Sequence, residues 1–472
     1  VADIRLAARE GYRSVEHLKR YTALGFGTDQ GKLGNINGMA ILADVLGQAP
    51  GKIGTTTFRP NYTPVTFGAI AGREIGSTFF DPIRKTAVHQ WHVENGAEFE
   101  NVGQWKRPWY YPLPGETMNE AVRRECLATR ESLGILDAST LGKIEIRGPD
   151  SVEFLNRIYT NSWLTLEIGR CRYGLMLGED GMVMDDGVTS RIGEDHYLMT
   201  TTTGGAAHVL AWMERWLQTE WPHLRVYLTS VTDHWFVTSV AGPNSREILT
   251  KLCTDIDFSA DAFPFMSVRA GTVAGIPARV YRISFSGELA YEINVSANYG
   301  RSLWQAIMTA GQSLNITPYG TEAMHVLRAE KGYIIVGQDT DGSVTPGDLG
   351  MDWIVSNGKD CIGKRSLSRQ DTRRENRKQL VGLTTVDPTL VLPEGVQLLN
   401  EPAKEFPTPM VGHVTSSYFS PSLRHSIALA LVKGGRSREG SMVYAQLIDG
   451  HVIPATIGQP KFFDPENQRQ KV

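Results

Sequence analysis

The sequence predicts a multi-domain α+β protein that ends in a small antiparallel β-barrel. Its 472 residues are enough for two to four domains with separate cores. Strand-like and helix-like segments follow one another in a mixed order, which favours α+β over the strict alternation of a doubly wound sheet. The barrel is expected in residues 379–472, because residues 379–463 contain short strand-like runs with frequent turns, one of them at Asp449-Gly450.

The composition is that of an ordinary soluble globular protein, with 41% hydrophobic and 21% charged residues. The net charge of −3 excludes a broad basic surface for nucleic acid or anionic lipid. No apolar run approaches the roughly 20 residues that a membrane-spanning helix needs. The four cysteines lack metal-binding spacing, so we expect free thiols in a reducing compartment, which indicates a cytoplasmic protein without a metal site.

Residues 1–80 are expected to be the end of a nucleotide-binding or linker region. Residues 4–24 have helical spacing, and Gly25 and Gly27 then open a glycine-rich loop before a second helix. The loop is similar to a phosphate-binding loop, but it follows a helix and lacks the GxGxxG spacing, which argues against a Rossmann domain. A contact with a nucleotide or flavin phosphate is left open. An irregular arm rich in threonine, proline and glycine follows over residues 61–80, and because the chain opens inside a helix without methionine we expect a piece of a longer protein.

Residues 81–365 are predicted to form the central part of the fold. His89 and His92 are an HxxH pair without further ligands in the sequence, which favours packing over a zinc site. Helices are expected at residues 118–133, 206–220 and 243–253, and one more helix should begin after a cap at Asp150. Strands are expected within residues 226–240 and 278–295, and an exposed basic connector should follow at residues 366–378.

The most informative stretch is residues 172–205. Two apolar runs flank Glu179-Asp180-Gly181, a strong hairpin signal, and the second run leads into Asp185-Asp186-Gly187. Neighbouring side chains in a strand point to opposite faces, so only one of the two aspartates can face a given cavity. A third strand ends in four threonines and two glycines. We interpret the stretch as a ligand wall with one carboxylate aimed into it; a surface hairpin with solvated acids stays the alternative.

Several motifs together resemble the aminomethyltransferase family, which includes the glycine-cleavage T-protein and the folate domains of dimethylglycine and sarcosine oxidising enzymes. They appear in the family's order from residue 81 to the C-terminus: LGILDASTLGKIEIRGPDSVEFLNRIYTN, YGLMLGEDGMVMDDGV, SFSGELAYEI, GTEAMHVLRAEKG and VGHVTSSYFSPSLRHSIALA. The resemblance implies three domains around a central channel that holds tetrahydrofolate. The preceding text, REGYRSVEHLKRYTALGFGTDQGK and GTTTFRPNYTPVTFGAIAG, resembles the middle of the α subunits of heterotetrameric sarcosine oxidases.

The resemblance also implies an activity. In this family context, sarcosine would be demethylated oxidatively to glycine with formation of hydrogen peroxide, and the one-carbon unit would pass to tetrahydrofolate as 5,10-methylenetetrahydrofolate. FAD and FMN would lie mainly on a flavin-carrying β subunit of a hetero-oligomer with smaller subunits, and NAD on the region that precedes this chain. A glycine-cleavage-type aminomethyltransferase and a related N-methyl amino acid dehydrogenase large subunit are the alternatives. The sequence decides neither the N-methyl amino acid nor the subunit stoichiometry.

The matching positions assign roles to individual residues. Asp185 is expected to accept a proton and stabilise the iminium cation, with Asp186 pointing away. Glu292 is expected to accept hydrogen bonds from the pterin amino group and ring N–H, with Glu288 as its rival in a turn. The remaining folate-binding residues implied by the resemblance are Tyr173 and Thr200 in the channel, Arg328 near the cavity or in a salt bridge to Glu330 or Asp348, and Arg424 at the glutamyl tail.

The sequence departs from T-proteins at three places. They commonly have tyrosine where this chain has Phe285, methionine where it has Leu141, and a Gly-Asp-Gly-like turn where it has Leu289-Ala290. These changes argue against activity on a lipoyl-bound aminomethyl group. They fit acceptance of a free imine or formaldehyde from a neighbouring flavin site.

Overall fold

The computed structural model describes residues 1–73, 83–403, 405 and 407–472. The chain divides into two compact units, Val1–Pro82 and Ile83–Val472, which are described separately. Part of the arm expected at 61–80, residues 74–80, lies outside the described residues.

The first unit is a small helical module. Its helices are α1 (Ala2–Arg9), α2 (Val15–Tyr21), α3 (Gly34–Leu46) and the short α4 (Phe67–Ala71). The single helix predicted over 4–24 is therefore wrong: it is broken into α1 and α2 at Gly11, whose φ of 100° lies in the left-handed region. A core of Ile4, Leu18, Leu42 and their neighbours holds α1, α2 and α3 together.

The glycine-rich loop before α3 is closed by one of its own carboxylates. The Asp29 side chain accepts hydrogen bonds from the backbone N–H groups of Gly31 at 2.9 Å, Leu33 at 2.9 Å and Gly34 at 3.1 Å. These N–H groups at the start of a helix are the donors that would otherwise bind a phosphate. Asp29 satisfies them and adds negative charge, so the loop has the contacts of a capped turn.

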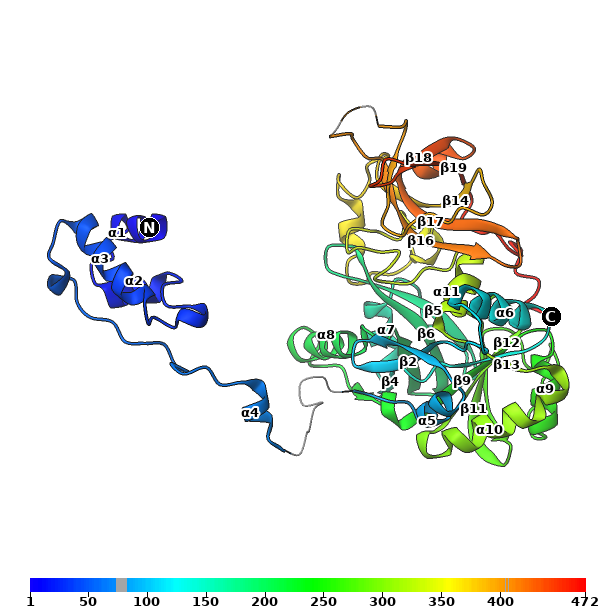
Figure 1. Cartoon of the computed structure of the whole chain (residues 1–472). Helices are drawn as coiled ribbons and strands as arrows, with labels where there is room; N and C mark the ends of the chain where they lie inside the picture. The colour runs from blue at the N-terminus through cyan, green and yellow to red at the C-terminus, as the bar shows by residue number, and fades with distance from the viewer. Residues whose placement is uncertain (74–82, 404, 406) are drawn as a thin grey trace. The chain divides into compact units, whose positions relative to one another are not determined.

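The second unit contains three larger β-structures and seven described helices (Figure 1). Its helices are α5 (His89–Glu94), α6 (Met118–Glu131), α7 (Ser151–Ile158), α8 (Ala206–Thr219), α9 (Ser245–Leu252), α10 (Gly300–Ala310) and α11 (Thr321–Glu330). A hairpin of β1 (Glu98–Val102) and β2 (Trp105–Tyr110) precedes α6. Thr117 caps α6 through a capping box with Glu120, which is why this helix begins where the sequence predicts.

The largest sheet has six strands in the order β10-β11-β12-β9-β3-β13. Its strands are β3 (Gly134–Asp137), β9 (Trp235–Ala241), β10 (Ser267–Val273), β11 (Ile276–Arg282), β12 (Ala290–Ser296) and β13 (Thr317–Pro318). Helices α9 and α10 cover one face and build the largest core with it (Figure 1). His92 is buried at the margin of this core, where it contacts Asp137 at 3.1 Å and the Tyr111 hydroxyl at 3.0 Å.

The second sheet has five strands in the order β5-β6-β7-β4-β8. Its strands are β4 (Gly142–Arg147), β5 (Cys171–Leu177), β6 (Val183–Gly193), β7 (His196–Thr201) and β8 (Tyr227–Ser230). The predicted hairpin is present as β5 and β6, paired antiparallel. Helices α7 and α8 cover one face of the sheet through a core that includes Phe154, Trp163 and Met213.

The C-terminal part closes into a six-stranded antiparallel barrel, which confirms the predicted architecture. Its strands are β14 (Lys378–Thr385), β15 (Gln397–Leu399), β16 (Gly412–Ser420), β17 (His425–Lys433), β18 (Met442–Gln446) and β19 (Val452–Gly458). Small and branched apolar side chains fill the interior, as expected for a barrel of this size. Within the described residues, no helix combines the length and apolar character needed to cross a membrane.

Candidate functional site: two facing sheets with three carboxylates

The two sheets of the second unit pack against each other through one face of each. A shared apolar cluster contains Cys171 of β5 and Leu198 of β7 from one sheet and Val268 of β10 and Tyr281 of β11 from the other. Next to this cluster, Arg279 of β11 lies 3.7 Å from a Glu145 carboxylate oxygen of β4. These contacts define which face of each sheet packs against the other sheet.

Asp185 has its carboxylate fully engaged by the neighbouring backbone and by Thr202. One oxygen accepts the Asp186 N–H at 2.7 Å and the Thr202 N–H at 3.1 Å, and the other accepts the Thr202 hydroxyl at 3.0 Å. Asp185 is 1% exposed, and burial raises its pKa. It pairs in register with Met176, on the face that carries the helix-covered core. Asp185 therefore ties β6 to the loop that begins α8.

Asp186 lies on the opposite face, together with Tyr173. The Tyr173 hydroxyl donates a hydrogen bond to an Asp186 carboxylate oxygen at 2.6 Å. Burial raises the pKa of Asp186 to about 7, the tyrosine hydrogen bond opposes this rise, and the charge of Asp185 adds to it. The alternation of the two aspartates is as expected. The aspartate that contacts Tyr173 is Asp186, whereas the sequence analysis expected Asp185 beside the folate nitrogens and Asp186 pointing away.

Thr200 lies on the same face as Tyr173 and Asp186. Its hydroxyl bridges to the main chain of β6, accepting from the Val188 N–H at 3.0 Å and donating to the Val188 carbonyl at 3.1 Å. Thr200 also pairs in register with Lys143 of β4. Thr200, which was expected to contact the pterin, thus uses its hydroxyl to satisfy main-chain groups of β6 next to Gly187.

Gly187 is required by the close approach of β7 to β6. A Cβ atom at this position would lie 1.9 Å from the Thr200 carbonyl oxygen, which belongs to the backbone and cannot turn aside. Replacing Gly187 with alanine should destabilise the fold by about 2–3 kcal/mol, because the strands would have to separate. Thermal unfolding checks this; the matched control Gly193→Ala, in the same strand with only an ordinary 3.5 Å contact, should be near neutral. Equal unfolding temperatures for Gly187→Ala and Gly193→Ala would show that the alanine at position 187 causes no strain.

Glu292 carries a carboxylate that makes no hydrogen bond or ion pair within the described part of the chain. It lies on β12, in register with Tyr281 on one side and Ser239 on the other, so it is on the face that packs toward the second sheet. Burial raises the pKa of Glu292 to about 7, and the nearby ammonium of Lys143 opposes the rise. A partly exposed but desolvated carboxylate without a partner is suited to a ligand that donates hydrogen bonds.

Lys143 is a residue that the sequence reasoning missed. It is 1% exposed, and its ammonium donates to the carbonyls of Ser139 at 2.7 Å and Leu141 at 2.8 Å. Burial lowers its pKa to about 8. The signal that could have identified Lys143 as a functional residue was its place in a strand between apolar Leu141 and Ile144, because a lysine is rarely buried without a partner.

Arg328 is buried and both of its terminal guanidinium nitrogens are engaged, whereas its Nε has no hydrogen-bond partner among the described residues. It is 0% exposed and forms an ion pair with Asp339, and it also donates to the Tyr333 carbonyl at 2.9 Å and the Ser416 hydroxyl at 2.6 Å. The ion pair is with Asp339, and not with Glu330 or Asp348, which the sequence analysis named as the alternative salt-bridge partners. These contacts join α11 to the barrel.

Arg424 lies in the exposed turn between β16 and β17, with a left-handed φ of 54°. No hydrogen bond or ion pair within the described residues joins it to the carboxylates of the facing sheets.

Phe285, which stands where T-proteins commonly have tyrosine, is 37% exposed and stacks on Tyr333 with ring centroids 6.1 Å apart.

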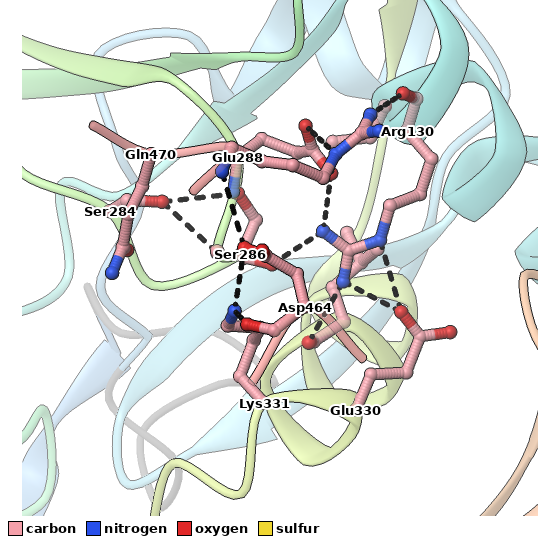
Figure 2. Close-up of polar contacts among 12 residues, drawn as sticks. Arg130, Ser284, Ser286, Glu288, Glu330, Lys331, Asp464 and Gln470 are labelled. Atoms are coloured by element: carbon pink, nitrogen blue, oxygen red, sulfur yellow. Dashed lines mark hydrogen bonds and ion pairs between the residues drawn. The ribbon is translucent and has the colours of Figure 1, made fainter. Parts of the chain in front are cut away.

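Glu288 belongs to a buried ion network that holds the loop before β12 (Figure 2). Arg130 of α6 donates to Glu288 at 2.7 Å and to Glu330 of α11 at 2.6 Å, and Arg469 donates to Glu288 at 2.8 Å. The side chains of Arg130, Glu288 and Glu330 are each at most 4% exposed. Glu288 is therefore a structural residue, and it stands four positions before Glu292.

A family profile now places this fold and site in a known class. The GCVT N-terminal domain matches residues 88–359, more than half of the chain, and the glycine cleavage T-protein C-terminal barrel domain matches residues 378–464. The chain therefore belongs to the glycine-cleavage T-protein family. A crystal structure of glycine cleavage system aminomethyltransferase T from Bartonella henselae has the same fold, with a TM-score of 0.70 at 23% identity over 81% of this chain and 99% of that one.

Particular relatives narrow the similarity further. The sarcosine oxidase A3 domain matches residues 1–73. The chain is 55% identical over 474 residues to sarcosine oxidase subunit alpha of Corynebacterium sp. (strain U-96) and 46% identical over 475 residues to that of Rhizobium meliloti (strain 1021), covering all of this chain but 49% and 48% of the relatives. It thus spans about half their length. An aminomethyltransferase of Thermotoga petrophila is 28% identical over 82% of this chain.

Proposed function

We propose that this chain is the folate-binding part of a sarcosine oxidase α subunit. The whole enzyme would oxidise sarcosine to glycine with release of hydrogen peroxide, and this part would transfer the one-carbon unit to tetrahydrofolate. The similarity to sarcosine oxidase α subunits over both units supports this assignment. FAD and FMN would lie mainly on a β subunit, and NAD on the remainder of the α subunit. Four free cysteines are in keeping with a cytoplasmic enzyme.

The observation that carries the proposal is the unpartnered Glu292 carboxylate on the face of its sheet that packs toward the second sheet, whose strands β5 and β6 carry Tyr173 and Asp186. A pterin ring offers an amino group and an adjacent ring N–H, which together match the two oxygens of a carboxylate. Reduced folate supplies two nitrogens that capture a formaldehyde equivalent. The chain's own residues would bind the pterin, orient these nitrogens and move one proton.

We assign the proton to Asp186. Its pKa of about 7 allows it to accept and release a proton near neutral pH, and Tyr173 holds one of its oxygens in place. Asp185, which the family resemblance suggested for this role, has both oxygens occupied by Thr202 and the main chain. In this proposal Asp185 positions the strand that carries Asp186.

A binding titration tests the folate site. Tetrahydrofolate added under anaerobic conditions to the whole chain should bind, and Glu292→Gln should weaken binding at least tenfold, because an amide accepts only one of the two N–H donors. Calorimetry measures both constants. Glu94→Gln, which removes the same charge from a surface pair with Arg301, is the control and should bind normally. Wild-type affinity in Glu292→Gln would reject the assigned pterin contact.

A second assay separates the oxidase from an aminomethyltransferase. Formation of methylenetetrahydrofolate should require sarcosine and the flavin-carrying partner. Turnover of a lipoyl-bound aminomethyl group by the chain without any flavoprotein would favour the aminomethyltransferase alternative.

A further inference from the structure

Lys143 and Glu292 face each other across the two packed sheets. Glu145 of β4 lies 3.7 Å from Arg279 of β11, so the face of β4 that carries Lys143 and Glu145 packs toward the face of β11 that carries Arg279 and Tyr281. Tyr281 is in register with Glu292. Two unlike charges therefore lie on the facing sides of the two sheets and interact electrostatically, and their side chains form no ion pair within 4.0 Å among the described residues.

Each of the two groups has unused hydrogen-bonding capacity. The Lys143 ammonium has three N–H donors, and the described residues accept from it at two carbonyls, those of Ser139 and Leu141. The Glu292 carboxylate has no donor among the described residues. A desolvated donor and a desolvated acceptor without partners cost free energy unless a ligand satisfies them.

The ligand that fits has two N–H donors next to a carbonyl acceptor. This is the edge of a 2-amino-4-oxopteridine, where the amino group and the ring N–H stand beside the ring carbonyl. We propose that Lys143 is a binding-site residue which donates to the ring carbonyl while Glu292 accepts the two N–H groups, so that the two charges clamp the pterin edge. The inference rests on the proposed folate function and adds a residue to its site.

Other groups around Glu292 do not supply the positive charge. Cys171 on β5, Tyr281 on β11 and Tyr319 ahead of α11 interact electrostatically with Glu292, and burial raises the pKa of each, so they are neutral near pH 7. Lys143 itself is influenced by Asp137, Asp233 and Arg84, besides Glu292. Lys143 is thus the group that favours the ionised form of Glu292.

The clamp predicts a bell-shaped pH dependence for binding of 5-formyltetrahydrofolate, an oxidation-resistant probe. Affinity should fall below about pH 7 as Glu292 takes up a proton and above about pH 8 as Lys143 loses one. In Lys143→Met the alkaline limb should vanish, and the acid limb should move up by about one pH unit, because Glu292 loses its neighbouring cation. At pH 7 the affinity should fall about tenfold.

Two further variants make the titration decisive. Lys143→Arg should keep the acid limb in the wild-type range and move the alkaline limb beyond pH 9, because arginine stays charged. Lys359→Met is a matched control: Lys359 also has a pKa lowered by burial to about 8 and also donates to backbone carbonyls, those of Asn156 and Tyr159, but it does not act on Glu292. Its profile should keep both limbs.

The outcomes separate the clamp from the folate site itself. Both wild-type limbs persisting in Lys143→Met would overturn the clamp, whatever the loss of affinity. If that variant unfolds, an alkaline limb near pH 8 in Lys143→Arg would do the same. Absence of probe binding by the wild-type protein would overturn the proposed function, and the clamp with it.

Discussion

Asp186→Asn should reduce the rate of one-carbon transfer to tetrahydrofolate by about 100-fold or more while sarcosine oxidation stays near the wild-type rate. The expected size is that of losing a positioned general base. Asparagine keeps the shape and the contact with Tyr173 but cannot take up a proton. The measurement follows hydrogen peroxide and methylenetetrahydrofolate in parallel in the assembled oxidase, so that oxidation and transfer are separated.

The neighbouring aspartate provides the comparison. Asp185→Asn should lower stability, because the amide cannot accept all three hydrogen bonds that Asp185 receives, but transfer by the folded fraction should be reduced less than in Asp186→Asn. If Asp185→Asn instead abolished transfer in a stably folded protein and Asp186→Asn did not, the assignment suggested by the family resemblance would be correct.

Arg130→Met should cost about 3–5 kcal/mol of stability. The substitution leaves Glu288 and Glu330 buried without their cation, and breaking a buried ion pair from one side has about this cost. The loss should appear as a lower midpoint in urea-induced unfolding. Because Glu288 precedes Glu292 by four residues, folate affinity should fall in the same variant.

Two companion variants test the electrostatic cause. Arg124→Met in the same helix breaks a partly exposed pair with Glu116 and should cost no more than about 1 kcal/mol. Adding Glu330→Gln to Arg130→Met should recover part of the lost stability, because one uncompensated charge is removed. A double variant less stable than Arg130→Met would show that packing, and not charge, dominates the loss.

The fold could be predicted where local signals and tertiary structure agree. The hairpin around Gly181, helix α6 with its capping box and the C-terminal barrel all follow from turn residues, caps and alternation. The prediction failed at 4–24, where helical spacing continues through Gly11 although the backbone turns there. Periodicity describes which side chains share a face, and it does not register a single residue that leaves the helical conformation.

The site could be predicted in part. Alternation in β6 correctly separates Asp185 from Asp186, but it does not tell which of them faces the other sheet; the register with Tyr173 decides this, and register is a tertiary property. Lys143 and the partner of Arg328 were missed for the same reason. Asp339 is 11 residues from Arg328, and nothing in the local sequence marks the pair.

The ion network around Glu288 also joins residues that are translated at different times. Arg469 donates to the carbonyl of Arg130, 339 residues earlier, and to Glu288, so the loop that leads into β12 is supported by a residue that is translated long after it. At roughly 5–20 residues per second, the ribosome releases Arg469 well over ten seconds after Arg130. During that interval Glu288 and the loop before the strand that bears Glu292 lack the contact with Arg469. We therefore expect a nascent chain to pair the strands of its two sheets before the loop that leads to Glu292 is held in place.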